Sequence, residues 1–273
     1  MRILISEAKI CLKRKEIHFV FLLLLLISIT AFIMECLAFY GSNLKFVRSS
    51  AESSLVQGVY AGSARLTLIF ILPLLSSLIY SDSFYTEYHN GVLKTILTKV
   101  DKSKYIFYKS IVTFFFSFSV FFITLFINLI LCTVTFPQVG FDNIYSLPPY
   151  DIAIQNYDNT YFLDIIRIES PFLFNVISII LLSLFAGLFS LFTLGIYFLF
   201  LSKNRVFGLF FSFLCYIGAN ILLVTLGFND LALTNQLKPI HSGTILQLIF
   251  WIIAIFVVSI YFIKKGINKE IIN

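Results

Sequence analysis

The chain has 273 residues, of which 59% are hydrophobic and 18% aromatic, while only 12% are charged. This composition lies far outside the usual range of soluble domains and predicts an integral membrane protein. The formal net charge is +6, but the basic residues are spread along the chain and form no concentrated basic surface, so nucleic-acid binding is not expected.

The first 17 residues predict a short amphipathic helix. Leu4, Ile5, Ala8, Cys11 and Leu12 share one arc at 100° per residue, opposite an arc that carries Arg2, Ser6, Lys9 and Lys13. Such a segment is typical of an interfacial helix that lies on the inner membrane surface. The alternative is a basic tail whose only role is to set the topology.

Six long runs contain no Asp, Glu, Lys or Arg, and each is long enough to cross a bilayer with some snorkelling of its flanks. They predict membrane spans at about 18–40, 66–82, 105–136, 171–201, 206–227 and 244–263. No small-residue cleavage site follows the first run, so we expect it to be a retained helix and not a signal peptide.

The distribution of basic residues predicts the orientation. With the N-terminus inside, 15 of the 20 Lys and Arg residues fall on the cytoplasmic side and 5 outside. The positive-inside rule therefore places both termini in the cytoplasm. The same topology makes 137–170 the longest outer segment, an acidic loop that either caps a substrate path or is merely tolerated outside.

Few polar side chains fall inside the predicted spans. Glu35, near the outer end of the first span, is expected to be an interfacial or bundle-facing residue, with substrate contact as the alternative, because a carboxylate is costly at membrane depth unless it reaches water. Asn128, Asn175 and Asn220 are expected to hydrogen-bond between helices, with a substrate path as the alternative.

The inner segment "EYHNGVLKTILTKVDKSKYIFYKS" predicts a second amphipathic helix, at about 91–102. Gly91 lets the chain turn into it and Asn90 can cap it. So short a helix needs a surface against which to bury its apolar side. The pattern itself leaves lipid and protein open as that surface. The apolar side consists of Val92, Leu93, Ile96, Leu97 and Val100.

The same segment resembles the inner loop between spans two and three of ABC type-2 transporter permeases. The matching residues are Glu87, Gly91, Val92, Leu93, Lys94, Ile96, Leu97, Thr98, Lys104, Tyr105 and Lys109. The resemblance implies that the short helix is a cytoplasmic coupling helix, seated in a groove of a separate ATP-binding subunit. It implies a coupling interface at Glu87, Tyr88, His89, Gly91, Val92, Leu93, Lys94, Ile96, Leu97 and Val100.

Two features depart from that family's pattern. "KVDKSKY" stands where the family commonly has a Pro-containing turn and an Arg, and the outer segment between spans three and four is longer than in the plainest members. The first puts the loop geometry in doubt. The second indicates a substrate or partner role peculiar to a subgroup.

Catalytic and cofactor motifs are missing from the sequence. It has no His-Glu-x-x-His pattern, no Gly-x-Ser-x-Gly elbow and no phosphate loop. His18, His89 and His241 share no helix face, so no zinc site is expected from them. The four cysteines have no metal-binding spacing and are expected to be small core residues. We therefore expect no catalytic, metal or cofactor site in this chain, with ATP and Mg²⁺ bound by the partner subunit.

The hydrophobic runs predict an all-α polytopic membrane protein, and the resemblance implies that it is the permease subunit of an ABC exporter. We expect a second permease chain, like or unlike, beside the ATP-binding subunit. Spans rich in Phe and Leu favour a hydrophobic or amphipathic cargo such as an antimicrobial or signalling peptide, then a lipid or drug. The Phe, Ile, Lys and Asn bias indicates an AT-rich bacterial genome, and we expect the protein in a bacterial cytoplasmic membrane. The competing hypothesis is a stand-alone membrane scaffold or immunity protein without an ATPase.

Overall fold

The structure is a computed structural model that describes residues 2–42, 47–138, 161–200, 204–239 and 241–267. Within these residues the chain is nearly all helical, and its one β-type pairing is an isolated bridge between Tyr161 and Ser242. Six helices are long and apolar enough to cross a membrane: α2 (Lys15–Phe39), α3 (Gly62–Tyr80), α6 (Lys102–Thr135), α9 (Pro171–Leu199), α10 (Arg205–Thr225) and α12 (Ile245–Ile267). The short helices are α1 (Arg2–Lys13), α4 (Ser83–His89), α5 (Val92–Leu97), α8 (Asp164–Glu169), η2 (Asn229–Leu231) and α11 (Leu233–Gln236).

The six helices confirm the predicted all-α class with six spans, although their ends differ by a few residues. The second span begins at Gly62 and not at 66, because the guanidinium of Arg65 folds back onto the preceding loop. Its Nη1 donates to the carbonyl oxygens of Val56 (2.8 Å) and Gly58 (3.1 Å). The last span continues to Ile267, with two lysines in its final turn, where positive charge complements the helix dipole.

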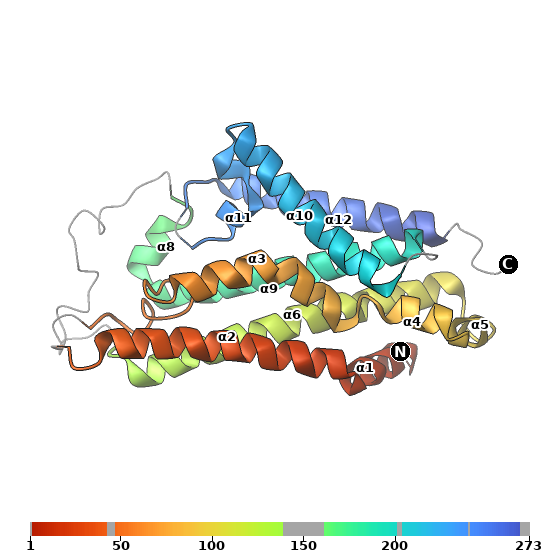
Figure 1. Ribbon diagram of the computed structural model, residues 1–273, viewed down its shortest axis with the longest axis horizontal. Coiled ribbons are helices and arrows are strands. Elements are labelled where there is room, and N and C mark those ends of the chain that lie inside the picture. Colours follow the sequence, from red (N-terminus) through yellow and green to blue (C-terminus); the bar gives the residue numbers. More distant parts are fainter. Residues whose placement is uncertain (1, 43–46, 139–160, 201–203, 240, 268–273) are drawn as a thin grey trace.

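Helix α9 lies in the middle of the bundle and packs against α3, α6, α10 and α12 (Figure 1). It is the most buried of the six candidate spans, and α12 is the least buried. Two glycines let neighbours approach closely: a Cβ at Gly187 would lie 2.7 Å from the Phe114 ring of α6, and one at Gly195 would lie 2.9 Å from Phe262 of α12. Close backbone approach of this kind is how helices associate in lipid.

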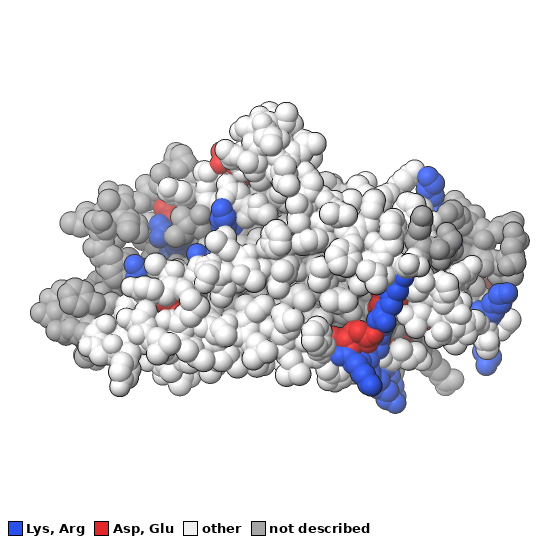
Figure 2. All heavy atoms as spheres, in the orientation of Figure 1, with Lys and Arg blue, Asp and Glu red and all other residues white. Residues whose placement is uncertain are grey.

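The two ends of the bundle differ from its middle. Helix α1, the α4–α5 segment and the C-terminal end of α12 lie at one end (Figure 1). Figure 2 shows charged side chains gathered toward the two ends of this face, with an uncharged band between them. A band without charge, bounded by charged ends, is what the hydrocarbon core of a bilayer requires.

The far end of the bundle is closed by connecting segments. Of the outer loop predicted at 137–170, residues 139–160 lie outside the described residues, and the part that follows contains α8. The backbone N–H of Phe162 donates to the carbonyl oxygen of His241 (3.2 Å), and the two rings stack. The end of this loop is therefore fastened to the connection between α11 and α12.

Candidate functional site

The segment between α3 and α6 forms a helical hairpin at the end of the bundle that carries α1. Helix α4 follows α3 almost directly, and Gly91, with φ of 72°, turns the chain into α5. A left-handed backbone at this point favours glycine over any residue with a side chain. Helix α5 covers only Val92–Leu97, shorter than the predicted 91–102, because the chain must turn at 98–101 to enter α6. The predicted Asn90 cap is absent: α5 has no side-chain cap.

One side of α5 is packed inside the chain. Leu93 is only 2% exposed, in a cluster with Phe84 of α4 and with residues of α6 and α9. Ile96, Leu97 and Val100 are half-buried against the same cluster. The stripe that the sequence predicts to contact a partner is therefore largely used to hold α5 on its own bundle. The cluster's other members are Tyr105, Ile106, Leu194, Tyr197 and Phe198.

What remains exposed is a compact surface that we call the α5 tip. Val92 is 47% exposed, although it belongs to the predicted apolar stripe. Its exposed neighbours are mostly polar or basic, which suits a water-filled contact with another protein. The α5 tip consists of His89, Asn90, Gly91, Val92, Lys94, Thr95, Thr98 and Lys99.

A buried charge cluster fastens α4 to α1 and α6. Lys109 of α6 is fully buried, and its Nζ lies 2.6 Å from Oε1 of Glu87 on α4 and 3.3 Å from Oε2 of Glu7 on α1. The hydroxyl of Tyr80 donates to Glu7 (2.7 Å), and that of Tyr105 donates to Glu87. Buried charges persist only when they are paired and hydrogen-bonded in this way. Glu87 is thus mainly an internal contact.

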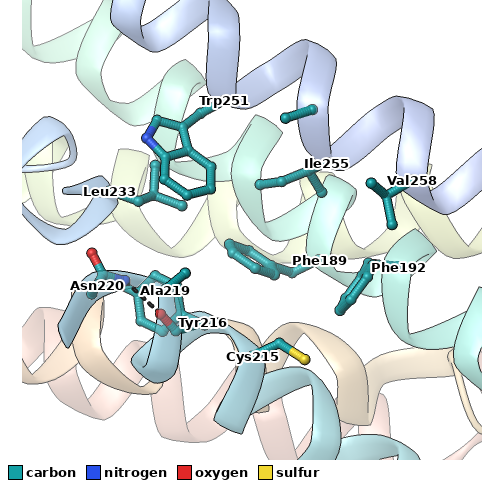
Figure 3. A pocket seen from close by; sticks show the side chains of 11 residues that line it. Phe189, Phe192, Cys215, Tyr216, Ala219, Asn220, Leu233, Trp251, Ile255 and Val258 are labelled. Atoms are coloured by element: carbon teal, nitrogen blue, oxygen red, sulfur yellow. Dashed lines mark hydrogen bonds between the residues drawn. The ribbon is translucent and has the colours of Figure 1, made fainter. Parts of the chain in front are cut away.

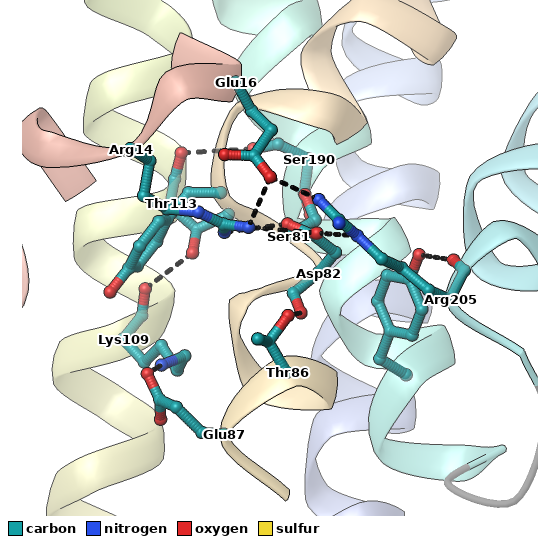
Figure 4. A network of polar contacts seen from close by, with 12 residues as sticks. Arg14, Glu16, Ser81, Asp82, Thr86, Glu87, Lys109, Thr113, Ser190 and Arg205 are labelled. Atoms are coloured by element: carbon teal, nitrogen blue, oxygen red, sulfur yellow. Dashed lines mark hydrogen bonds and ion pairs between the residues drawn. The ribbon is translucent and has the colours of Figure 1, made fainter. Parts of the chain in front are cut away.

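A second cluster is centred on Asp82, at the joint between α3 and α4 (Figure 4). Both Asp82 oxygens accept from Arg14, at 2.8 and 3.0 Å, and Oδ2 also accepts from Nε of Arg205 (2.5 Å). Glu16 completes the ring by pairing with both arginines. Burial by itself lowers the pKa of Arg14, but the charge of Asp82 and the hydrogen bonds to it raise that pKa above the ordinary value. The cluster joins α1, α2, α4 and α10.

Three of the four residues expected near a substrate path fasten the loop between α2 and α3. Glu35 is fully buried and accepts from the backbone N–H of Ala61 (2.9 Å), while its Oε2 has no partner among the described residues. Asn128 accepts from the N–H of Leu55 and donates to the carbonyl of Ser28, both at 2.7 Å.

Asn175 holds the same loop from α9. Its Nδ2 donates to the carbonyl of Ala51 (2.6 Å), and its Oδ1 accepts from the side chain of Gln57 (2.9 Å). The amides of Asn128 and Asn175 therefore bond mainly to this loop, through its backbone and the Gln57 side chain, and the bond from Asn128 to Ser28 is the exception. The sequence positions of Asn128 and Asn175 inside spans predict that each amide has a hydrogen-bond partner. Which residue that partner is depends on how the loop between α2 and α3 folds back onto the bundle.

Asn220 lies apart from the other three, beside an apolar cavity of about 220 Å³ between α9, α10 and α12 (Figure 3). Its Nδ2 donates to the carbonyl of Tyr216 (2.7 Å), and its Oδ1 accepts from the N–H of Thr234 (2.8 Å). Because the Asn220 amide is already hydrogen-bonded within the chain, the cavity offers a ligand mainly hydrocarbon and aromatic surface. The lining includes Phe189, Phe192, Cys215, Leu233, Trp251 and Ile255.

Five charged residues of the two clusters were not predicted from the sequence: Glu7, Arg14, Glu16, Asp82 and Arg205. One signal for the first cluster was available. Lys109 lies more than one turn into a long helix, where a lysine needs an acidic partner. Which acid it contacts depends on helix packing, because Glu7 is 102 residues away.

No metal or reactive thiol is indicated in this region. Among the described residues, no three His, Cys, Asp or Glu side chains are grouped to hold a metal ion. Cys11 of α1 is fully buried, and burial raises the pKa of its thiol to about 12. The thiol therefore stays protonated at neutral pH and packs as a small apolar group.

Comparison with known proteins gives one match. A family model described as ABC-2 family transporter protein matches residues 10–156, just over half of the chain. The matched stretch contains α2 to α6, and with them the α5 tip and most of both charge clusters. No curated protein and no solved structure matches.

Proposed function

The chain belongs to the family of ABC-2 transporter proteins and is therefore a membrane permease component of an ABC transporter, and from this premise we propose that the partner ATP-binding subunit docks on the α5 tip. The observation that carries this proposal is the division of the α4–α5 hairpin. Leu93 and Glu87 hold it to the bundle, while Val92 and Lys94 project outward. A contact surface with a rigid backing transmits force better than a free loop.

The two charge clusters support a mechanical route from the α5 tip to the spans. A push on α5 is passed to α6 and α9 through the Leu93 cluster, and to α6 and α1 through Glu87 and Lys109. Asp82 passes the same displacement to α2 and α10. Closure of the ATP-binding subunits would thus shift several spans together, between inward-open and outward-open states.

The cargo that we propose is a hydrophobic or amphipathic molecule, such as an antimicrobial or signalling peptide, moved outward. The apolar cavity beside Asn220 supports this choice, because it offers aromatic surface and no unpaired charge. A lipid or drug would use the same surface. We further propose that the permease acts as a dimer with a like or unlike chain, in a bacterial cytoplasmic membrane with both termini inside.

Site-specific photo-crosslinking tests the docking proposal. A photoreactive benzoyl-phenylalanine replaces Val92 in the full chain, which is expressed in its native host and illuminated in the membrane. We expect an adduct with a protein whose peptides contain a phosphate-loop sequence and which hydrolyses ATP. The matched control carries the probe at Val134, an 80% exposed valine near the C-terminal end of α6, far along that helix from its junction with the α5 segment.

Each outcome decides the proposal. An ATP-binding adduct at position 92 and none at position 134 supports it. Adducts at position 92 that consist only of phospholipid would refute docking there. Consistent absence of any ATP-binding protein from the purified complex would favour the stand-alone scaffold or immunity protein instead.

A further inference from the structure

A groove of about 700 Å³ runs along the bundle between α6 and α12, and its lining includes no residue of either charge cluster. Both helices pack on α9 at the close contacts of Gly187 and Gly195, and Leu191 between those glycines lines the groove. Its volume falls within the usual range of small-molecule sites. The apolar lining comes from all three helices: Phe107, Ile111, Phe115, Leu191, Phe256 and Ile260.

The groove has one polar end and a long apolar course. On α6 its lining runs from Ser103 to Phe115, about 18 Å at 1.5 Å per residue. The serines along it are bonded to their own helices: Ser110 donates to the carbonyl of Ile106 (2.9 Å), and Ser259 to that of Ile255 (2.6 Å). The course between its ends therefore asks for no polar group from a ligand.

Lys264 of α12 marks the polar end. It lines the groove, it is exposed, and it makes no ion pair or hydrogen bond with any residue in the part of the chain that the structure describes. It lies at the same end of the bundle as α5, near the first turn of α6. A ligand here meets the ammonium group of Lys264 at its head and hydrocarbon along its tail.

We propose that this groove binds an anionic phospholipid, with one acyl chain along Phe107, Ile111 and Ile260 and the phosphate at Lys264. Basic pockets between spans at the cytoplasmic side recognise anionic head groups in this way. A transmembrane helix of a second copy would fill the apolar course but leave Lys264 without a counter-charge. The assignment to the inner leaflet rests on the orientation proposed above, whereas the binding itself does not.

Native mass spectrometry of the full-length chain in detergent tests the proposal. The protein is incubated separately with phosphatidylglycerol and phosphatidylcholine of identical acyl chains. We expect phosphatidylglycerol to be retained about fivefold better, the discrimination that one lysine contact provides near a membrane surface. Ile260→Trp fills the groove and should abolish retention of both lipids. Lys264→Gln should remove the preference but keep the binding.

Matched controls separate these effects from general damage. Lys13→Gln removes another exposed lysine at the same end of the bundle, and Leu246→Trp adds an indole at an exposed position elsewhere on α12. Both should bind lipid like the unmodified chain, and size-exclusion chromatography checks that every variant is folded.

Several outcomes would overturn the proposal. These are equal retention of the two lipids by the unmodified chain, unchanged retention by Ile260→Trp, or displacement of the lipid by millimolar inorganic phosphate, which would indicate a soluble anion site. If Ile260→Trp instead dissolves a dimer while lipid is retained, the groove accommodates a second copy. No ATP-binding subunit is needed in this assay, so its failure is distinguishable from failure of the docking proposal.

Discussion

Lys109 shows how a single side chain can connect segments far apart in the sequence. Its ammonium group lies between Glu7 and Glu87, over the rings of Tyr80 and Tyr105 at 5.2 and 5.0 Å. Removing one member of a buried ion pair leaves the other charge uncompensated, which costs more than the intact pair contributes. The cluster therefore makes α1, α4 and α6 depend on one another.

Replacement of Lys109 by alanine should destabilise the protein strongly. Two acidic side chains would be left buried without their cation, at a cost of about 3–5 kcal/mol. Thermal unfolding of the detergent-purified chain measures the effect. Lys13→Ala removes an exposed lysine from α1 and should leave the melting temperature unchanged.

A compensated variant makes the Lys109 test specific. Lys109→Met combined with Glu7→Gln and Glu87→Gln removes all three charges, so it should recover much of the stability lost in Lys109→Ala. If the triple variant is no more stable than Lys109→Ala, the charge explanation is wrong and shape alone determines the loss.

Helix α5 illustrates how tertiary packing divides an amphipathic pattern at the scale of an element. Six residues are too few for a stable isolated helix, so α5 exists because Leu93 enters the cluster formed by α4, α6 and α9. Val92 occupies the same sequence arc and yet points to solvent. Leu93 thus holds α5 on its own bundle, while the adjacent Val92 stays available for the proposed contact with the ATP-binding subunit.

Leu93→Ala and Val92→Ala should change different properties of the protein. Leu93→Ala removes a buried side chain at a cost of about 2 kcal/mol or more, and so raises the population of undocked α5 at least about tenfold. Trypsin cleavage after Lys94 and Lys99 reports that population. Val92→Ala should leave cleavage unchanged but weaken recovery of the ATP-binding subunit on purification. Equal cleavage of both variants would show that Leu93 does not hold α5.

At the scale of the whole molecule, the arrangement of the helix ends determines which segments share a side of the membrane. The α5 tip lies at the same end as α1 and the lysines that end α12 (Figure 1). The loop between α2 and α3, which contains Tyr60 and is bound through Glu35 and Asn128, lies at the other end. The orientation that we propose therefore places the α5 tip, α1 and the C-terminal lysines of α12 on the cytoplasmic side together.

Cysteine labelling of intact cells tests that orientation. In a chain whose four native cysteines are replaced by alanine, Tyr60→Cys should react with a membrane-impermeant maleimide, because Tyr60 is exposed at the outer end. Lys94→Cys should react only after the cells are opened. The reverse pattern would place the α5 tip outside, where no ATP-binding subunit could reach it.

The amino-acid sequence by itself determined the number of spans, their approximate limits and the amphipathic α5 segment, because hydrophobic runs and helical periodicity are local properties of the chain. It also carried the family resemblance at Glu87 to Lys109. Only the tertiary structure decided that Leu93 faces inward, that Glu7 and Glu87 share Lys109, and that Asn128 binds a loop 73 residues away. These contacts arise when helices distant in sequence pack side by side, and local periodicity holds no information on which partner each side chain meets.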